Sequence, residues 1–282
     1  MLQAPQRTGL SGPTLIRLLT RLTDAEVQQS RQSLSDHLSQ WLGWTDAIAL
    51  SAALNTAPPV IAPGARMFSS AEERECVRVR TTLADAIASD TAATAAKRVA
   101  PARAPAKKLA AVLAEDAFDY SSFRQRYLSL QHTMETSIGN LRSRLRGMVA
   151  ARNGEWTRLA VVDAIMDRAL LPKERALLGA IPKLLQAHFD RLRKAEEAAL
   201  AKAAEQALAE PGAPADATAD VPGDTEAPAV DAAQAGTSPP APAITAGAWL
   251  DTFRADMRAV LLAELDVRLQ PVEGLLAALR TS

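Results

Sequence analysis

One stripe of apolar residues constrains the fold of this chain more than any other feature. It lies in residues 121–152, which contain no proline, and its members follow one another at steps of 4, 3, 4, 4, 3, 4 and 3. We call these eight positions the seam: Phe123, Tyr127, Leu130, Met134, Ile138, Leu141, Leu145 and Met148. The spacing predicts one helix with one apolar side, with a stutter where two steps of four adjoin. A helix of roughly 48 Å needs a partner, so we expect coiled-coil-like packing.

The central region, 109–210, should hold further long helices. Asn153 and Gly154 favour a break after the seam, and a second helix can return from there as an antiparallel hairpin. We expect that helix to end at Leu171 and a third helix to begin at Pro172, with Pro182 kinking the third or dividing it in two. After Lys194 the third helix turns alanine-rich, which predicts a solvent-exposed extension.

The segments before this region predict smaller units. Residues 11–90 contain short helical patterns, which we interpret as an N-terminal helical bundle with Trp41 and Trp44 in its core. Residues 91–108 combine alanine, proline and basic side chains, so we expect a linker that is at best partly helical.

The segments after the central region predict a tether and a docking helix. Residues 211–247 have acidic residues but no lysine, arginine or large aromatic side chain, which is typical of a disordered linker. Residues 248–282 carry an apolar stripe made of Trp249, Phe253, Met257, Val260 and Leu261. A helix that follows a disordered linker is unstable alone, so this stripe must dock on its own chain or on a partner.

Together these patterns predict an all-α protein without a recognisable catalytic or cofactor site. No glycine-rich phosphate loop occurs among the 13 glycines, the three histidines are far apart, and Cys76 is the one cysteine. We therefore expect no enzyme, no metal and no cofactor. No run approaches the roughly 20 apolar residues of a membrane span, and the first residues lack a signal peptide, so we expect a cytoplasmic protein.

The most suggestive polar feature is a run of arginines on the seam helix. Arg142 and Arg146 lie one turn apart and Arg144 lies to the side. Their like charges repel each other unless a negatively charged group pairs with them. They could pair with acidic residues of another helix, bind nucleic-acid phosphate together with the basic 97–108 tract, or meet a membrane surface or acidic partner. Asp163 and Asp167 could offer a metal two carboxylates, but no third ligand is evident.

The closing residues resemble a known family. The runs 249–253 (WLDTF), 262–266 (LAELD) and 268–279 (RLQPVEGLLAAL) are similar to an uncharacterised family of helical proteins from Gram-negative bacteria. The resemblance covers most of the chain and brings no catalytic residues. It implies an accessory role beside envelope-associated proteins. Our hypothesis is a non-enzymatic interaction or assembly factor that forms a homo-oligomer or binds protein partners; the alternative is a nucleic-acid-binding accessory protein.

Overall fold

The computed structural model describes residues 13–23, 32–55, 68–99, 119–152, 154–209 and 247–281, without the side chains of 90–99 and 207–209. Every regular element in these ranges is an α-helix, which confirms the all-α prediction. The helices are α1 (Thr14–Thr23), α2 (Leu34–Trp41), α3 (Trp44–Asn55), α4 (Ser70–Val99), α6 (Tyr120–Ala150), α7 (Gly154–Leu178), α8 (Ile181–Ala209) and α9 (Ala248–Arg280). No helix in the described ranges is long and apolar enough to cross a membrane.

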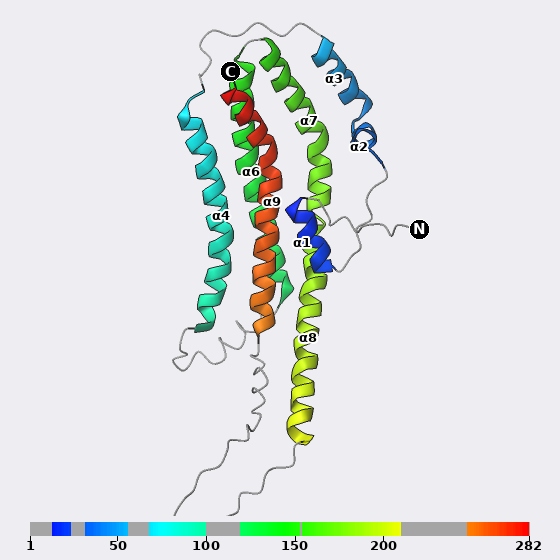
Figure 1. Ribbon diagram of the computed structural model, residues 1–282, viewed down its shortest axis with the longest axis vertical. Helices are drawn as coiled ribbons and strands as arrows, with labels where there is room; N and C mark the ends of the chain where they lie inside the picture. The colour runs from blue at the N-terminus through cyan, green and yellow to red at the C-terminus, as the bar shows by residue number, and fades with distance from the viewer. Residues whose placement is uncertain are drawn as a thin grey trace, which may run out of the picture.

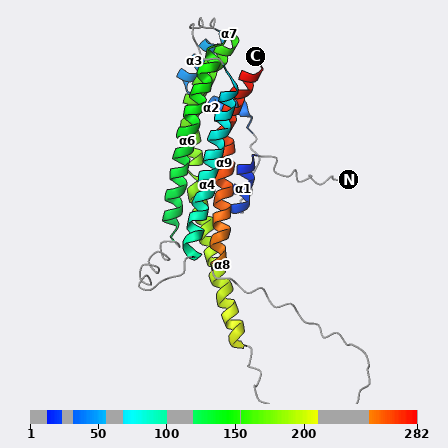
Figure 2. The same ribbon diagram turned by 90° about the vertical axis from the view of Figure 1, so that its left-hand side faces the viewer.

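The centre of the molecule is the contact between α6 and α9, which lie side by side and run in the same direction (Figure 1). Helix α4 runs antiparallel to α9 on one flank, where Glu73 pairs with Arg280. Helices α7 and α8 complete the bundle, and the far end of α8 projects beyond it (Figure 2). The core is therefore built around a helix that lies far along the chain from most of its neighbours.

Aromatic side chains close the end of the bundle where α6 and α9 begin. Phe123 of α6 and Phe253 of α9 have ring centroids 5.2 Å apart, edge to face. Phe189 of α8 lies 4.8 Å from Trp249 and 5.0 Å from Phe253. Such pairs add roughly 0.5–1.5 kcal/mol each beyond the area that they bury. The aromatic end fixes where α9 starts relative to α6 and α8.

The break between the second and third central helices differs from the predicted position. Helix α7 runs through Pro172 to Leu178, and the chain turns at Gly179. The side chain of Pro172 is exposed, so water can hydrate the carbonyl that its missing N–H leaves free. Pro182 occupies the first turn of α8, where no intrahelical hydrogen bond is lost. The run that was predicted to begin at Pro172 is therefore divided in two just before Pro182, one of the two expected outcomes, and α8 is not kinked there.

The N-terminal helices do not form the predicted bundle of their own. Helix α1 packs on α8 and α9, α2 and α3 pack on α7, and α4 packs on α9 and α6. Trp44, predicted to be a core residue, is 81% exposed, and Trp41 is only partly buried. Because the apolar residues of α3 are not confined to one side of the helix, packing one side on α7 leaves Trp44 facing solvent.

The predicted linkers are tested only in part. Residues 91–99, assigned to a linker, continue α4 as far as Val99, because alanine propagates a helix that the capping residues Ser69 and Glu72 have started. Residues 100–108, and 211–247 apart from Gly247, lie outside the described residues. Gly247 has a positive φ of 86° and precedes the first residue of α9.

The bundle predicts that the seam stabilises the single chain. Leu141→Asp would place an unpaired charge in the core, where the native side chain is 5% exposed. We expect a loss of more than about 3 kcal/mol in the free energy of unfolding. Leu128→Asp, on the exposed side of the same helix, should change it by less than about 1 kcal/mol. Urea unfolding followed by circular dichroism measures both, and equal losses would contradict the assignment.

Candidate functional site

The arginines of α6 face carboxylates of α7. One guanidinium nitrogen of Arg142 lies 2.6 Å from Asp163 and another lies 2.6 Å from Asp167. Arg146 repeats the pattern at 2.6 and 2.7 Å. All four side chains are partly buried, between 14% and 29% exposed. We call this set the arginine–aspartate cluster. It joins α6 to α7 through charge-assisted bonds that fix their register.

Carboxylates of the same chain pair with the arginines that were predicted to bind an anion. Burial alone would lower the pKa of Arg146, but hydrogen bonds to Asp167 and Asp163 outweigh it and raise that pKa. Arg144 pairs on the other flank with Glu72 of α4, at 3.2 Å. The two aspartates are therefore held by guanidinium groups. In the described part of the chain, no group of three or more potential metal-ligating side chains gathers.

A second charged set lies inside the core, at the contact of α6 with α9. The carboxylate of Glu264 is fully buried. It accepts a hydrogen bond from Tyr127 Oη at 2.7 Å, from Gln131 Nε2 at 2.9 Å and from Arg268 Nε at 2.9 Å. Gln131 also donates to the carbonyl of Leu178, at the end of α7. The buried charge is thus surrounded by donors, which is the condition for tolerating it.

The same network reaches α7 through Arg268. The Nη1 of Arg268 donates to Oε1 of Glu174 at 2.9 Å. Burial raises the pKa of Glu174 more than the charge of Arg268 lowers it. Burial and the neighbouring carboxylate of Glu264 raise the pKa of Tyr127, so its hydroxyl remains a donor at neutral pH. Tyr127, Gln131, Glu174, Glu264 and Arg268 form what we call the Glu264 cluster, which ties together three helices.

The Glu264 cluster was not predicted, although its signal is visible in the sequence. The seam prediction chose Leu130, which is only partly buried, while Gln131 beside it is buried. The other seven seam residues are buried. A step of four from Tyr127 to Gln131 fits a helix as well as a step of three does. In α9 the charged residues Glu264 and Arg268 likewise fall among buried apolar neighbours, and polar residues at such positions indicate a network.

The predicted docking stripe of α9 lies against the rest of the same chain. Trp249, Phe253, Met257, Val260 and Leu261 are each at most 7% exposed. Helix α9 makes most of its contacts with α6, α4, α8 and α1. His188 of α8 is buried, and its Nε2 lies 2.9 Å from Asp256 of α9. The seam and the docking stripe are thus two sides of one intramolecular contact.

Exposed large apolar residues occur on several helices, and three of them lie on α3. Trp44 and Ile48, one turn apart on α3, are 81% and 53% exposed. Leu54 of the same helix and Leu34 of α2 are also exposed. Asp46 pairs with Arg168 of α7 at 3.0 Å and holds α3 against the bundle. We call Trp44, Ile48 and Leu54 the α3 face.

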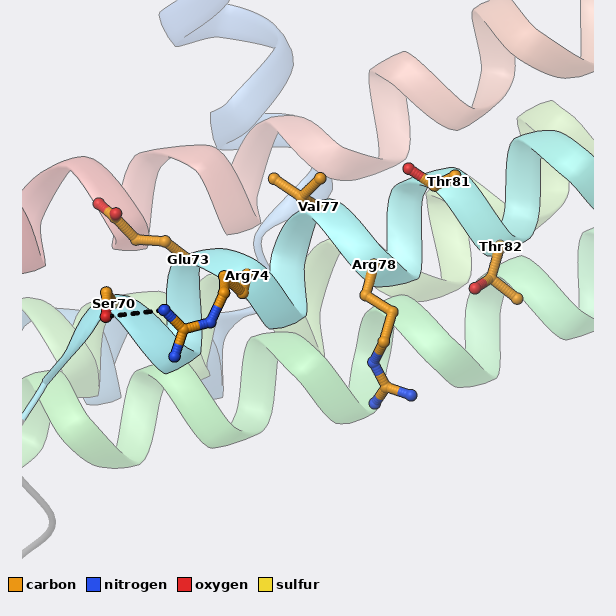
Figure 3. Close-up of a pocket in the computed structure, with 7 residues that line it drawn as sticks. All are labelled: Ser70, Glu73, Arg74, Val77, Arg78, Thr81 and Thr82. Atoms are coloured by element: carbon orange, nitrogen blue, oxygen red, sulfur yellow. Dashed lines mark hydrogen bonds between the residues drawn. The ribbon is translucent and has the colours of Figure 1, made fainter.

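One surface hollow lies along α4 and is lined by residues of that helix alone. Figure 3 shows this shallow hollow, lined by Ser70, Glu73, Arg74, Val77, Arg78, Thr81 and Thr82. All seven come from one helix, and Arg74 is occupied by a hydrogen bond to Ser70 at 3.0 Å. A catalytic site needs groups from several elements converging on one point, which this surface does not provide.

The Glu264 cluster predicts strong energetic coupling across the core. Glu264→Ala leaves Arg268 buried without its main partner, so we expect a loss of roughly 3–5 kcal/mol in the free energy of unfolding. The double variant with Arg268→Ala should lose at least about 1 kcal/mol less than the sum of the single losses. Asp266→Ala, which removes an exposed partner of Arg80, should cost less than about 1 kcal/mol. Additive losses in urea unfolding would refute the coupling.

Comparison with known proteins supports one assignment. The searches of curated proteins and of solved structures each found no match. A family model described as "Protein of unknown function (DUF3348)" matches residues 1–217 and 223–281. This match agrees with the resemblance to an uncharacterised family that the closing residues indicated. Because nearly the whole length is matched, the chain belongs to this family of unknown function, DUF3348.

Proposed function

We propose that this chain is a non-enzymatic protein-interaction or assembly factor that binds partners through the α3 face. The supporting observation is the exposure of Trp44 at 81% next to Ile48 at 53%. Single exposed apolar side chains are common, but a tryptophan with an aliphatic neighbour one turn away forms a patch that water solvates poorly. Tryptophan is also enriched among the residues that dominate binding energy at protein interfaces.

The charges around the α3 face favour one kind of partner. Residues 32–55 contain Asp36 and Asp46 but no lysine or arginine. Both carboxylates already have partners in the same chain, Asp46 with Arg168 and Asp36 with Ser33, so the segment favours a partner with an apolar centre over one that relies on basic residues. The bundle supports α3, which packs along α7 and adds the exposed ion pair of Asp46 with Arg168.

The burial of the seam changes how assembly would take place. Seven of its eight residues are buried in the chain's own core, so a second protein could use the seam only by opening the bundle. Assembly into a homo-oligomer or with other proteins therefore uses other surfaces in this proposal. We retain a cytoplasmic location and an accessory role beside an envelope-associated complex as parts of the proposal, on the basis of the resemblance alone.

The nucleic-acid alternative receives less support. Arg142, Arg144 and Arg146 each pair with a carboxylate of the same chain, so phosphate would have to displace Asp163, Asp167 or Glu72. Phosphate binding gains from releasing counterions at unpaired cations, and these three guanidinium groups are already neutralised. The side chains of the basic tract 97–108 lie outside the described residues.

The test is cross-linking and affinity capture of the full-length chain from its native cells, with and without nuclease. Trp44→Ser should remove the proteins that cross-link through 32–55, with at least a tenfold lower yield, since an interface tryptophan contributes about 2 kcal/mol or more. Leu128→Ser is the matched control, because it removes an exposed leucine from α6 and should leave the yield unchanged. Equal capture by wild type and Trp44→Ser would refute the proposal, and capture that nuclease abolishes would favour nucleic acid.

A further inference from the structure

One arginine of α9 is buried while part of its guanidinium group is unpaired. Arg254 is 4% exposed, and its guanidinium carbon lies over the ring of Phe123, 5.9 Å from the ring centroid. Nη1 of Arg254 donates to the carboxylate of Asp251 at 2.8 Å. Nε and Nη2 are also buried, and in the described part of the chain neither has a hydrogen-bond acceptor. Burying a charged donor without an acceptor costs free energy, so these two nitrogens lack a partner that would stabilise them.

The two unpaired nitrogens form one edge of the guanidinium plane. Arg142 shows what this edge can bind in the same molecule, because its Nε and Nη2 both donate to the carboxylate of Asp163, at 3.2 and 2.6 Å. Two parallel N–H bonds of this kind fit two oxygens of one carboxylate or phosphate group. A chloride ion offers only one atom to the same two donors. The free edge of Arg254 therefore matches an oxyanion.

A second arginine follows one turn later on the same side of α9. Arg258 is exposed, and among the described residues no carboxylate forms an ion pair with it. Arg142 and Arg146 of α6 have the same spacing, and there Asp163 bonds to both. Like charges one turn apart repel each other unless an anion pairs with them. The arginine pair of α6 has such a carboxylate, whereas the pair of α9 has none within the described ranges.

We propose that Arg254 and Arg258 bind a small oxyanion, either phosphate or a carboxylate. Nε and Nη2 of Arg254 donate to two oxygens of the anion, and the guanidinium group of Arg258 pairs with it from the solvent side. Two arginines face one carboxylate, that of Asp251, so the anion neutralises a net positive charge. The site lies on α9 and shares no residue with the α3 face, so it adds a binding activity beyond the partner binding proposed above.

The depth of the site favours a small ion over a group carried on a large partner. Asp251, which pairs with Arg254, is 66% exposed, and Arg258 is exposed, so the site lies just below the surface. The side chains that cover Nε and Nη2 must move aside for an ion to enter. Once bound, the ion supplies acceptors to two buried donors. Because the unfolded chain does not hold the two arginines in this arrangement, the ion stabilises the folded chain.

The test follows urea unfolding of the full-length chain by circular dichroism while sodium chloride is replaced by sodium phosphate or sodium acetate, at constant pH and ionic strength. For the wild type, the unfolding equilibrium constant should fall about elevenfold when the anion concentration is ten times its dissociation constant. Arg254→Met and Arg254→Lys should lose this response, because neither side chain has the edge of two nitrogens. Arg258→Ala changes an exposed residue and should raise the dissociation constant roughly two- to fivefold.

Arg280→Met is the matched control, because it removes an arginine of the same helix whose Nε is already paired with Glu73 at 2.7 Å. This variant should keep the wild-type response. Phosphate also stabilises folded proteins in general by exclusion from their surfaces, an effect that is the same in every variant. A larger specific response to phosphate than to acetate assigns the ligand to phosphate, and the reverse assigns it to a carboxylate. Equal stabilisation of the wild type, Arg254→Lys and Arg258→Ala, or no stabilisation of the wild type by either anion, would overturn the site.

Discussion

The structure depends on the burial of one face of α9 against α6, with the carboxylate of Glu264 at the middle of that contact. Apolar contacts supply most of the free energy, since they are many and lose water on both sides. They would allow the two helices to slide past each other with modest loss. The hydrogen bonds from Tyr127 and Gln131 remove that freedom, because any shift would leave the buried carboxylate without donors.

Many charged residues in the described part of this protein form ion pairs that join one helix to another. The chain has 32 basic and 32 acidic side chains, and pairs such as Arg142 with Asp163 join α6 to α7. On the opposite flank, Arg80 pairs with Glu273 of α9. An arginine-rich helix in a sequence therefore does not by itself indicate an external anion. Its meaning depends on carboxylates that the fold brings alongside, 21 residues away in the case of Asp163.

Local periodicity predicted the helices well, because a buried stripe on a helix repeats at a spacing that sequence displays directly. The seam helix was expected over 121–152 and is found from Tyr120 to Ala150. Periodicity could not tell which of two adjacent residues is buried where both fit the helical spacing, as with Leu130 and Gln131. The helix break was misplaced because Pro172 disrupts a helix only when its surroundings cannot satisfy the freed carbonyl, which depends on exposure rather than on sequence.

Tertiary neighbours were the least accessible to prediction. The pattern of α3 does not reveal whether Trp44 faces a neighbour or solvent, since the apolar residues of that helix are not confined to one of its sides. The arginine–aspartate cluster was open to prediction in part, because Asp163 and Asp167 share the one-turn spacing of the two arginines. The Glu264 cluster joins residues more than 130 positions apart, and a single sequence carries no measure of such proximity.

The placement of α9 also bears on the order in which the molecule can form during synthesis. Of the described helices, α9 leaves the ribosome last, yet it supplies the surface on which α1, α4 and α6 pack. At 5–20 residues per second, the 71 residues from 210 to 280 take several seconds to translate. Throughout that interval α6 can pack on α4, α7 and α8 but lacks α9, its largest partner. The nascent protein therefore passes through a stage in which the side of its core that receives α9 is uncovered.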